Sequence, residues 1–158
     1  MKHIMRQANN NFTHSQLKLM YCFAAFFSFL SGIAIYVFFR SHNLVLFQFI
    51  PQPPFLSSLR VPLRTDTILG YLFTFNLPHG LWCLSGLFVI RAIWLTNIKW
   101  RAVYGGLFLV AISSLEISQL SEKRYGTFDA LDLVFYGVSA FAESVIFNMF
   151  TRRKERKR

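Results

Sequence analysis

Acidic residues are scarce in this chain, and so the few that occur are informative. Seven Asp and Glu stand against 17 Lys and Arg, for a formal net charge of +10 over 158 residues. Cysteine is rarer still: Cys22 and Cys83 both fall inside apolar segments, which argues against a disulfide and against a thiolate metal site. Of four histidines, His79 alone lies in an apolar segment, which argues against a haem held by two histidines.

Apolar residues make up 54% of the chain, including 19 Phe, which is more than a soluble domain of this length can bury. A helix that crosses a bilayer needs about 20 predominantly apolar residues. Four runs meet this requirement, namely 19–39, 67–90, 102–121 and 133–151. The third run contains Glu116 and the fourth contains Glu143, while the first two carry no charge. The sequence therefore predicts an all-α protein, a four-helix transmembrane bundle.

The apolar runs divide the chain into three regions. We expect a loose, polar N-terminal segment at 1–16, a transmembrane domain at 17–151 and a basic tail at 152–158. The expected helices cover about 17–39, 68–90, 101–121 and 129–150. The first run is too long for a signal peptide and no Ala-x-Ala-like site follows it, which favours a retained anchor. Pro78 removes one backbone hydrogen bond and is expected to kink the second helix.

Basic residues are distributed unevenly between the two sides of the predicted bundle. Twelve of the 17 fall on the side that holds both chain ends and the 92–100 connection. The positive-inside rule therefore predicts that both termini are cytoplasmic and that the long 40–66 connection is extracytoplasmic. The basic tail is expected to meet anionic lipid headgroups rather than nucleic acid, and Glu143 to reach toward it.

The 40–66 connection contains its own apolar stretch. Residues 44–50 are almost entirely apolar and are followed by three prolines within 51–54. Proline cannot continue a helix, so this stretch is expected to lie on the outer interface or to re-enter the membrane. Simple packing of a hydrophobic loop on the helix ends is an equal alternative.

Polar side chains recur at helical spacing on three of the predicted helices. The stripes are Asn76, His79, Cys83 and Gly86 on the second helix, Ser113, Glu116 and Gln119 on the third, and Asp129, Asp132, Tyr136, Ser139 and Glu143 on the fourth. Residues at such spacing share one face of a helix. Because charges in hydrocarbon are costly unless paired, we expect these faces to meet around a pocket that opens on the extracytoplasmic side. Its predicted members are His79, Glu116, Gln119, Asp129, Asp132 and Tyr136, with no metal and no cofactor.

The acidic members of this set also have structural explanations. Asp129 stands where a residue would cap the N-terminus of the fourth helix. Glu116 is expected to be protonated, to pair with Lys123 or Arg124, or to bond Gln119. Gln119 itself fits an amide that bridges two membrane helices. A pocket and a set of helix-locking contacts are therefore both compatible with the pattern.

Residues 70–145 resemble the VanZ-like family, small membrane proteins named for a teicoplanin-resistance protein. The resemblance rests on Pro78-His79-Gly80, on Glu116-x-x-Gln119 and on Gly126-Thr-Phe-Asp129-x-x-Asp132. The sequence departs from the family at Tyr136 and Ser139, where Asn and Gly are common, and in having Leu-Pro-His in place of Lys-x-x-His. The resemblance implies a protein of the bacterial cytoplasmic membrane with a role in the cell envelope, such as glycopeptide tolerance.

Four functions are compatible with these residues. The favoured one is binding of an amphiphilic or lipid-linked envelope component, with Glu116, Gln119 and Asp132 on its polar groups and Phe-rich walls around its apolar part. A structural accessory subunit, with a protein partner or oligomer, is the main alternative. An enzyme acting on lipid headgroups through His79 is less favoured, because no nucleophile stands out beyond scattered serines. A proton or ion path along the acids, which include Glu143, completes the set.

Overall fold

The computed structural model describes residues 2–39, 61, 65–121 and 128–155, and every regular element in these ranges is a helix. Four helices are long and apolar enough to cross a membrane: His14–Phe39, Ile68–Ile93, Ile98–Ser118 and Ala130–Met149. The prediction of an all-α protein with four such helices is therefore confirmed. The expected extracytoplasmic loop falls almost entirely outside the described residues.

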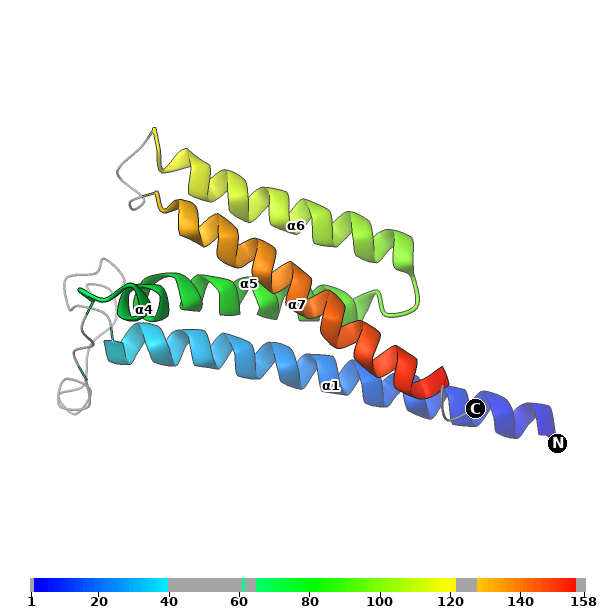
Figure 1. Cartoon of the computed structure of the whole chain (residues 1–158). Helices are drawn as coiled ribbons and strands as arrows, with labels where there is room; N and C mark the ends of the chain where they lie inside the picture. The colour runs from blue at the N-terminus through cyan, green and yellow to red at the C-terminus, as the bar shows by residue number, and fades with distance from the viewer. Residues whose placement is uncertain (1, 40–60, 62–64, 122–127, 156–158) are drawn as a thin grey trace, which may run out of the picture.

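The helices follow one another in an up-and-down order (Figure 1). They are α1 (Lys2–Phe39), α4 (Ile68–Tyr71), the π-helical segment η1 (Leu72–Asn76), α5 (Leu77–Ile93), α6 (Ile98–Ser118) and α7 (Ala130–Glu155). Consequently α5 and α7 run in one direction, and α1 and α6 run in the other (Figure 1). α1 starts at Lys2 and not near residue 17, so the N-terminal segment continues the helix instead of being loose. No Gly or Pro interrupts 2–16, and the helix therefore meets no breaker there.

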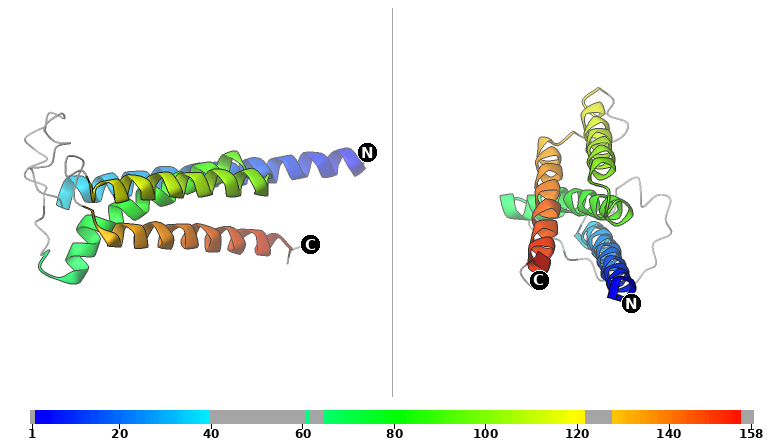
Figure 2. Two further views of the ribbon diagram at one scale, coloured as in Figure 1. Left: turned by 90° about the horizontal axis from the view of Figure 1, so that it is seen from above. Right: turned by 90° about the vertical axis from the view of Figure 1, so that its right-hand side faces the viewer.

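The predicted kink in the second membrane span takes the form of a π turn. Pro78 has no backbone N–H, and its ring would clash with the carbonyl of Thr74 in a regular α-helix. The chain avoids the clash by inserting η1, in which the Leu77 N–H bonds the carbonyl of Leu72, five residues earlier. The span continues through this segment, and Figure 2 shows α4 bent away from the axis of α5.

Helix α1 packs along α5 and forms the main core with it. The buried cluster consists of Tyr21, Ala25, Phe88, Ala92 and Leu95. The backbones approach closely because small residues lie at the contact: Ser85 Oγ donates to the carbonyl of Ala25 at 2.8 Å. At Gly32 a Cβ atom would overlap the indole of Trp82, so only glycine permits this approach.

Helix α6 lies on the outside of the bundle and buries little of its surface (Figure 2). Its one buried residue is Glu116, near its C-terminal end. Most of its exposed side chains are apolar, among them Val103, Leu107, Val110 and Leu115. Such a surface is suited to acyl chains. Because Glu116 is buried on an otherwise exposed helix, we infer that the C-terminal end of α6 makes a specific contact with the rest of the bundle.

Candidate functional site

The polar stripes of α5 and α7 meet in a regular register. The pairs are Asn76 with Asp129, His79 with Asp132, Cys83 with Tyr136 and Arg91 with Glu143, separated by 53, 53, 53 and 52 positions. A nearly constant separation is what two helices that run side by side in the same direction produce. The register divides the polar groups into one cluster at the start of the two helices and another toward their ends.

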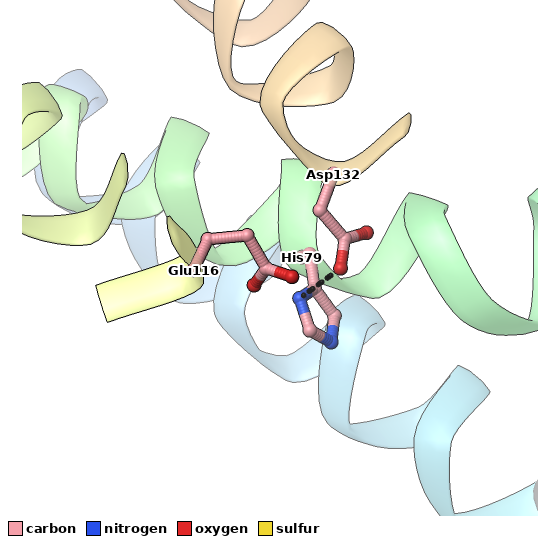
Figure 3. A group of neighbouring side chains, drawn as sticks. All are labelled: His79, Glu116 and Asp132. Atoms are coloured by element: carbon pink, nitrogen blue, oxygen red, sulfur yellow. Dashed lines mark ion pairs between the residues drawn. The ribbon is translucent and has the colours of Figure 1, made fainter. Parts of the chain in front are cut away.

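The first cluster, the acid–histidine cluster, consists of His79, Glu116 and Asp132 (Figure 3). These side chains come from α5, α6 and α7 and converge on one point. His79 Nδ1 lies 3.1 Å from Asp132 Oδ2. Glu116 is 3% exposed and Asp132 is 5% exposed, so both carboxyl groups are shielded from the surroundings of the protein.

A buried amide holds two carboxylates of this region together. Asn76 is fully buried, and its Nδ2 donates to Asp129 Oδ2 at 2.8 Å and to Asp132 Oδ1 at 2.9 Å. Since His79 of α5 occupies Asp132 Oδ2 and Asn76 of η1 bonds Oδ1, both oxygens of Asp132 have partners on the second membrane span. Asp132 is therefore oriented from two sides, by a neutral amide and by an imidazole.

Glu116 joins the end of α6 to the start of α7. Its Oε1 accepts a hydrogen bond from the backbone N–H of Asp129 at 3.0 Å. Its Oε2 accepts one from Gln119 Nε2 at 3.3 Å. Of the partners considered for Glu116, Gln119 is thus found, whereas Lys123 and Arg124 lie outside the described residues.

Asp129 both caps a helix and belongs to the polar site, two roles that were considered as alternatives. Its Oδ1 accepts from the N–H of Leu131, which caps the N-terminus of α7, while its Oδ2 accepts from Tyr71 and Asn76. Partial burial raises the pKa of Asp129, but the hydrogen bonds from Asn76, the Leu131 N–H and Tyr71 outweigh it, so the pKa lies below its ordinary value. Asp129 is therefore held as a carboxylate beside the cluster.

Two residues that bond Asp129, Tyr71 and Asn76, were absent from the predicted site, and the π turn explains why Tyr71 was missed. Tyr71 and Asn76 both donate to Asp129 Oδ2, although residues five apart lie on different faces of an α-helix. The i→i+5 repeat of η1 brings them to the same face. Asn76 was recognisable as a polar residue one turn before His79 in an apolar run, whereas Tyr71 had no such signal.

A cavity of about 270 Å³ adjoins the acid–histidine cluster. Its walls are His79, Trp82, Cys83, Phe108, Ile112 and Tyr136. Tyr136, a predicted site residue, therefore contributes to this cavity and not to the hydrogen bonds of the cluster. His79 belongs to both, and its ring stacks on Trp82 with centroids 5.8 Å apart. His79 thus belongs both to the acid–histidine cluster and to the wall of this largely apolar cavity.

The second cluster lies toward the other end of α5 and α7. Glu143 does not reach the tail as expected but forms a buried ion pair with Arg91, whose Nε and Nη2 donate to its two carboxylate oxygens. Arg91, which the sequence presents as a topology residue at the end of an apolar run, is 6% exposed. Glu143 is therefore neutralised internally and takes no part in the acid–histidine cluster.

The chemistry of the acid–histidine cluster follows from its donor set. His79, Glu116 and Asp132 each offer one ligand atom, and these atoms all lie within 4.8 Å of one another. One imidazole nitrogen with two carboxylate oxygens is a set that accepts ammonium or hydroxyl donors and also suits a divalent metal. Comparisons with protein-family models, with curated proteins and with solved structures each found no match, so this geometry carries the functional argument.

Proposed function

We propose that this chain is a VanZ-like integral membrane protein that binds an amphiphilic or lipid-linked envelope component from the extracytoplasmic side of a bacterial cytoplasmic membrane. The observation that carries the proposal is the double position of His79. It lies 3.1 Å from Asp132 and also lines the 270 Å³ cavity. A ligand with a polar headgroup and an apolar part is the molecule that satisfies both surfaces at once.

The charges of the site indicate which headgroup it accepts. Glu116, Asp129 and Asp132 face a single imidazole, and the other donors to them are neutral amide, hydroxyl and backbone groups. The surplus negative charge favours a headgroup that carries an ammonium group or several hydroxyl donors. Such a group would replace part of the internal hydrogen bonding of the cluster.

The size of the cavity limits the apolar part of the ligand. Small-molecule sites usually measure about 300–1,000 Å³. At about 270 Å³ this cavity takes a short apolar portion, with Trp82, Phe108 and Ile112 as its walls. The rest of a long acyl or prenyl chain would lie along the exposed apolar surface of α6, in the bilayer.

The family assignment is supported by the way its motifs converge. His79, Glu116 and Asp132 belong to the three separate motifs that resemble the VanZ-like family, and they meet in one cluster. The distribution of basic residues supports cytoplasmic termini. Four helices of membrane-spanning length support a polytopic protein.

A divalent-cation site is the second candidate function, and the donor set of the acid–histidine cluster favours it. An imidazole nitrogen and two carboxylate oxygens lie within 4.8 Å of one another. Catalytic zinc sites use three protein ligands and leave one position open. Metal content of the purified chain separates this candidate from the first, because amphiphile binding requires none.

The proposed function is tested by what copurifies with the chain. The full chain and its Glu116→Gln and Asp132→Asn variants are purified in mild detergent, and bound lipids are identified by mass spectrometry. We expect an amphiphile that is enriched with the wild type and lost from both variants. Asp66→Asn, the same type of change at an exposed acid, serves as the matched control and should retain it. If all four proteins carry the same lipids at equal membrane abundance, the accessory-subunit function replaces this proposal.

A further inference from the structure

A second cavity, of about 300 Å³, lies between α5, α6 and α7 at the end opposite the acid–histidine cluster. Its charged walls are Arg91, Arg101 and Glu143, and Gly105 and Gly106 also line it. Two positive charges thus face one negative charge in this cavity. The proposed function does not use any of these groups.

Arg91 lines this cavity as an almost fully buried cation. Only 6% of Arg91 is exposed, and its Nε and Nη2 both donate to Glu143. Its Nη1 is buried and has no hydrogen-bond partner among the described residues. Because Nη1 is enclosed on all sides, Arg91 contributes to the cavity through its charge and not through this donor.

Arg101 brings a second guanidinium group to the same place. Its Cζ lies 4.7 Å from the ring centroid of Phe147, and the Cζ of Arg91 lies 4.0 Å from the same centroid. Among the described residues Glu143 pairs with Arg91 alone, and Arg101 has no carboxylate partner. One aromatic ring therefore holds two cations next to each other with a net charge that favours an anion.

The start of α6 adds to this positive potential. Ile98 and Ala102, in the first turns of the helix, line the cavity. Asn97 caps the helix, and its Oδ1 accepts from the N–H of Trp100 at 3.2 Å. Helix N-termini carry partial positive charge and favour anions.

The cavity also reaches the ends of two apolar spans, where lipid phosphates are expected when the spans cross a bilayer. It adjoins the turn between the spans Ile68–Ile93 and Ile98–Ser118. Next to it Trp94 stacks on Tyr104 at 5.3 Å and packs near Trp100 at 6.0 Å, an aromatic group typical of the membrane interface. Basic pockets between membrane helices at this level bind anionic headgroups.

We propose that this cavity binds a phosphate group, carried by an anionic phospholipid headgroup or by a free phosphate anion. The guanidinium of Arg101 binds its oxygens, the charge of Arg91 adds to the positive potential of the cavity, and the first turn of α6 adds its partial charge. Glu143 keeps Arg91 in place and, by its own charge, limits the site to a single phosphate. The site is distinct from the acid–histidine cluster, whose excess charge has the opposite sign.

The test measures ligand-induced stabilisation of the detergent-purified full chain. Thermal unfolding is followed while dioctanoyl phosphatidylglycerol, inorganic phosphate or dioctanoylglycerol is added. The last has the same acyl chains as the first and no phosphate. We expect saturable stabilisation by the phospholipid and none by dioctanoylglycerol. Stabilisation by inorganic phosphate as well would identify the free anion as a ligand, and its absence would identify the lipid headgroup.

Three variants locate the binding site. Arg101→Gln leaves the Arg91–Glu143 pair in place and should raise the half-saturating phospholipid concentration about tenfold, as expected for loss of one charge-assisted contact. Gly105→Leu should do the same by filling the cavity, since nothing lies within 4 Å of a Cβ at that position. Lys99→Gln, an exposed cation two residues from Arg101 that does not line the cavity, should leave the concentration unchanged.

Two results would overturn the phosphate site. One is an equal effect of Lys99→Gln and Arg101→Gln, which would mean general attraction to a basic surface. The other is equal stabilisation by dioctanoylglycerol, which would mean that the acyl chains alone bind. Gly105→Leu changes no charge and therefore tests the cavity even if Arg101→Gln lowers the yield of folded protein.

Discussion

The two ends of the α5–α7 interface bury carboxylates in opposite ways. Glu143 is neutralised by Arg91 through two hydrogen bonds, and Arg101 adds a further positive charge. Asp132 and Glu116, at the other end, are held by neutral amide and backbone donors and by one imidazole. The register between the two helices differs by only one position between the ends.

This difference means that one packing arrangement supports two sites of opposite charge. An arginine that forms a bidentate pair neutralises a carboxylate and locks the helices together. Neutral donors orient a carboxylate and leave its charge available to a ligand. We therefore expect the Arg91 end to dominate the stability of the protein and the Asp132 end to dominate binding of a cationic or hydroxylated headgroup.

The largest effect is expected from Glu143→Gln. It leaves the charge of Arg91 buried without its carboxylate, which should lower the free energy of unfolding by about 3–5 kcal/mol. The measurement is thermal unfolding in detergent, together with membrane abundance. A double variant, Arg91→Met with Glu143→Met, should recover much of the loss, and its failure to do so would mean that the pair serves another purpose.

Asn76→Leu should have the next largest effect, at the acidic end. It removes both N–H groups that hold Asp129 and Asp132 side by side. The bond to Asp129 is only partly buried, so the loss should come mainly from the buried bond to Asp132, worth about 1.5–3 kcal/mol. Thermal unfolding and the bound-lipid analysis should therefore both change. Unaltered binding with unaltered stability would show that the amide does not organise the acids.

Glu116→Gln provides the sharpest contrast with Glu143→Gln, because the same substitution is made in a buried site at the opposite end. The amide oxygen can still accept the hydrogen bond from the N–H of Asp129, so stability should change by less than about 1 kcal/mol. Ligand retention should nevertheless be lost. If this variant is as unstable as Glu143→Gln, the two ends do not differ in the way we describe.

The smallest effect concerns pH and Asp129. Its pKa in the folded protein lies below the ordinary value of 3.8, so the stabilisation is fully present above that value and is lost as the pH falls through the lower, folded-state pKa. The melting temperature of the wild type should therefore decrease more on acidification in this range than that of Asp129→Asn. Parallel curves of melting temperature against pH for the two proteins would contradict this prediction.

Much of the candidate site follows from local sequence patterns, and the remainder depends on contacts between helices. The spacing of Glu116 with Gln119 and of Asp129 with Asp132 was enough to place each pair on one helical face. The Arg91–Glu143 pair was not predictable, because it depends on the register between α5 and α7, which are separated in the sequence by α6. Tyr71 was missed because helical spacing was taken as 3.6 residues per turn, and η1 departs from it.

The sequence by itself determined that four helices long and apolar enough for a membrane would form. The length of each apolar run, its apolar content and the position of helix-breaking residues are all local properties. It also determined that the few acids within these runs needed partners, because an isolated charge is unfavourable in hydrocarbon whatever the fold. Only the tertiary structure decided which partner each acid received. That choice depends on the close approach of α1 and α5 at Gly32, on the parallel register of α5 and α7, and on the π turn before Pro78. The first two features arise from packing between residues far apart in the chain, whereas the π turn is the form taken by the local kink at Pro78.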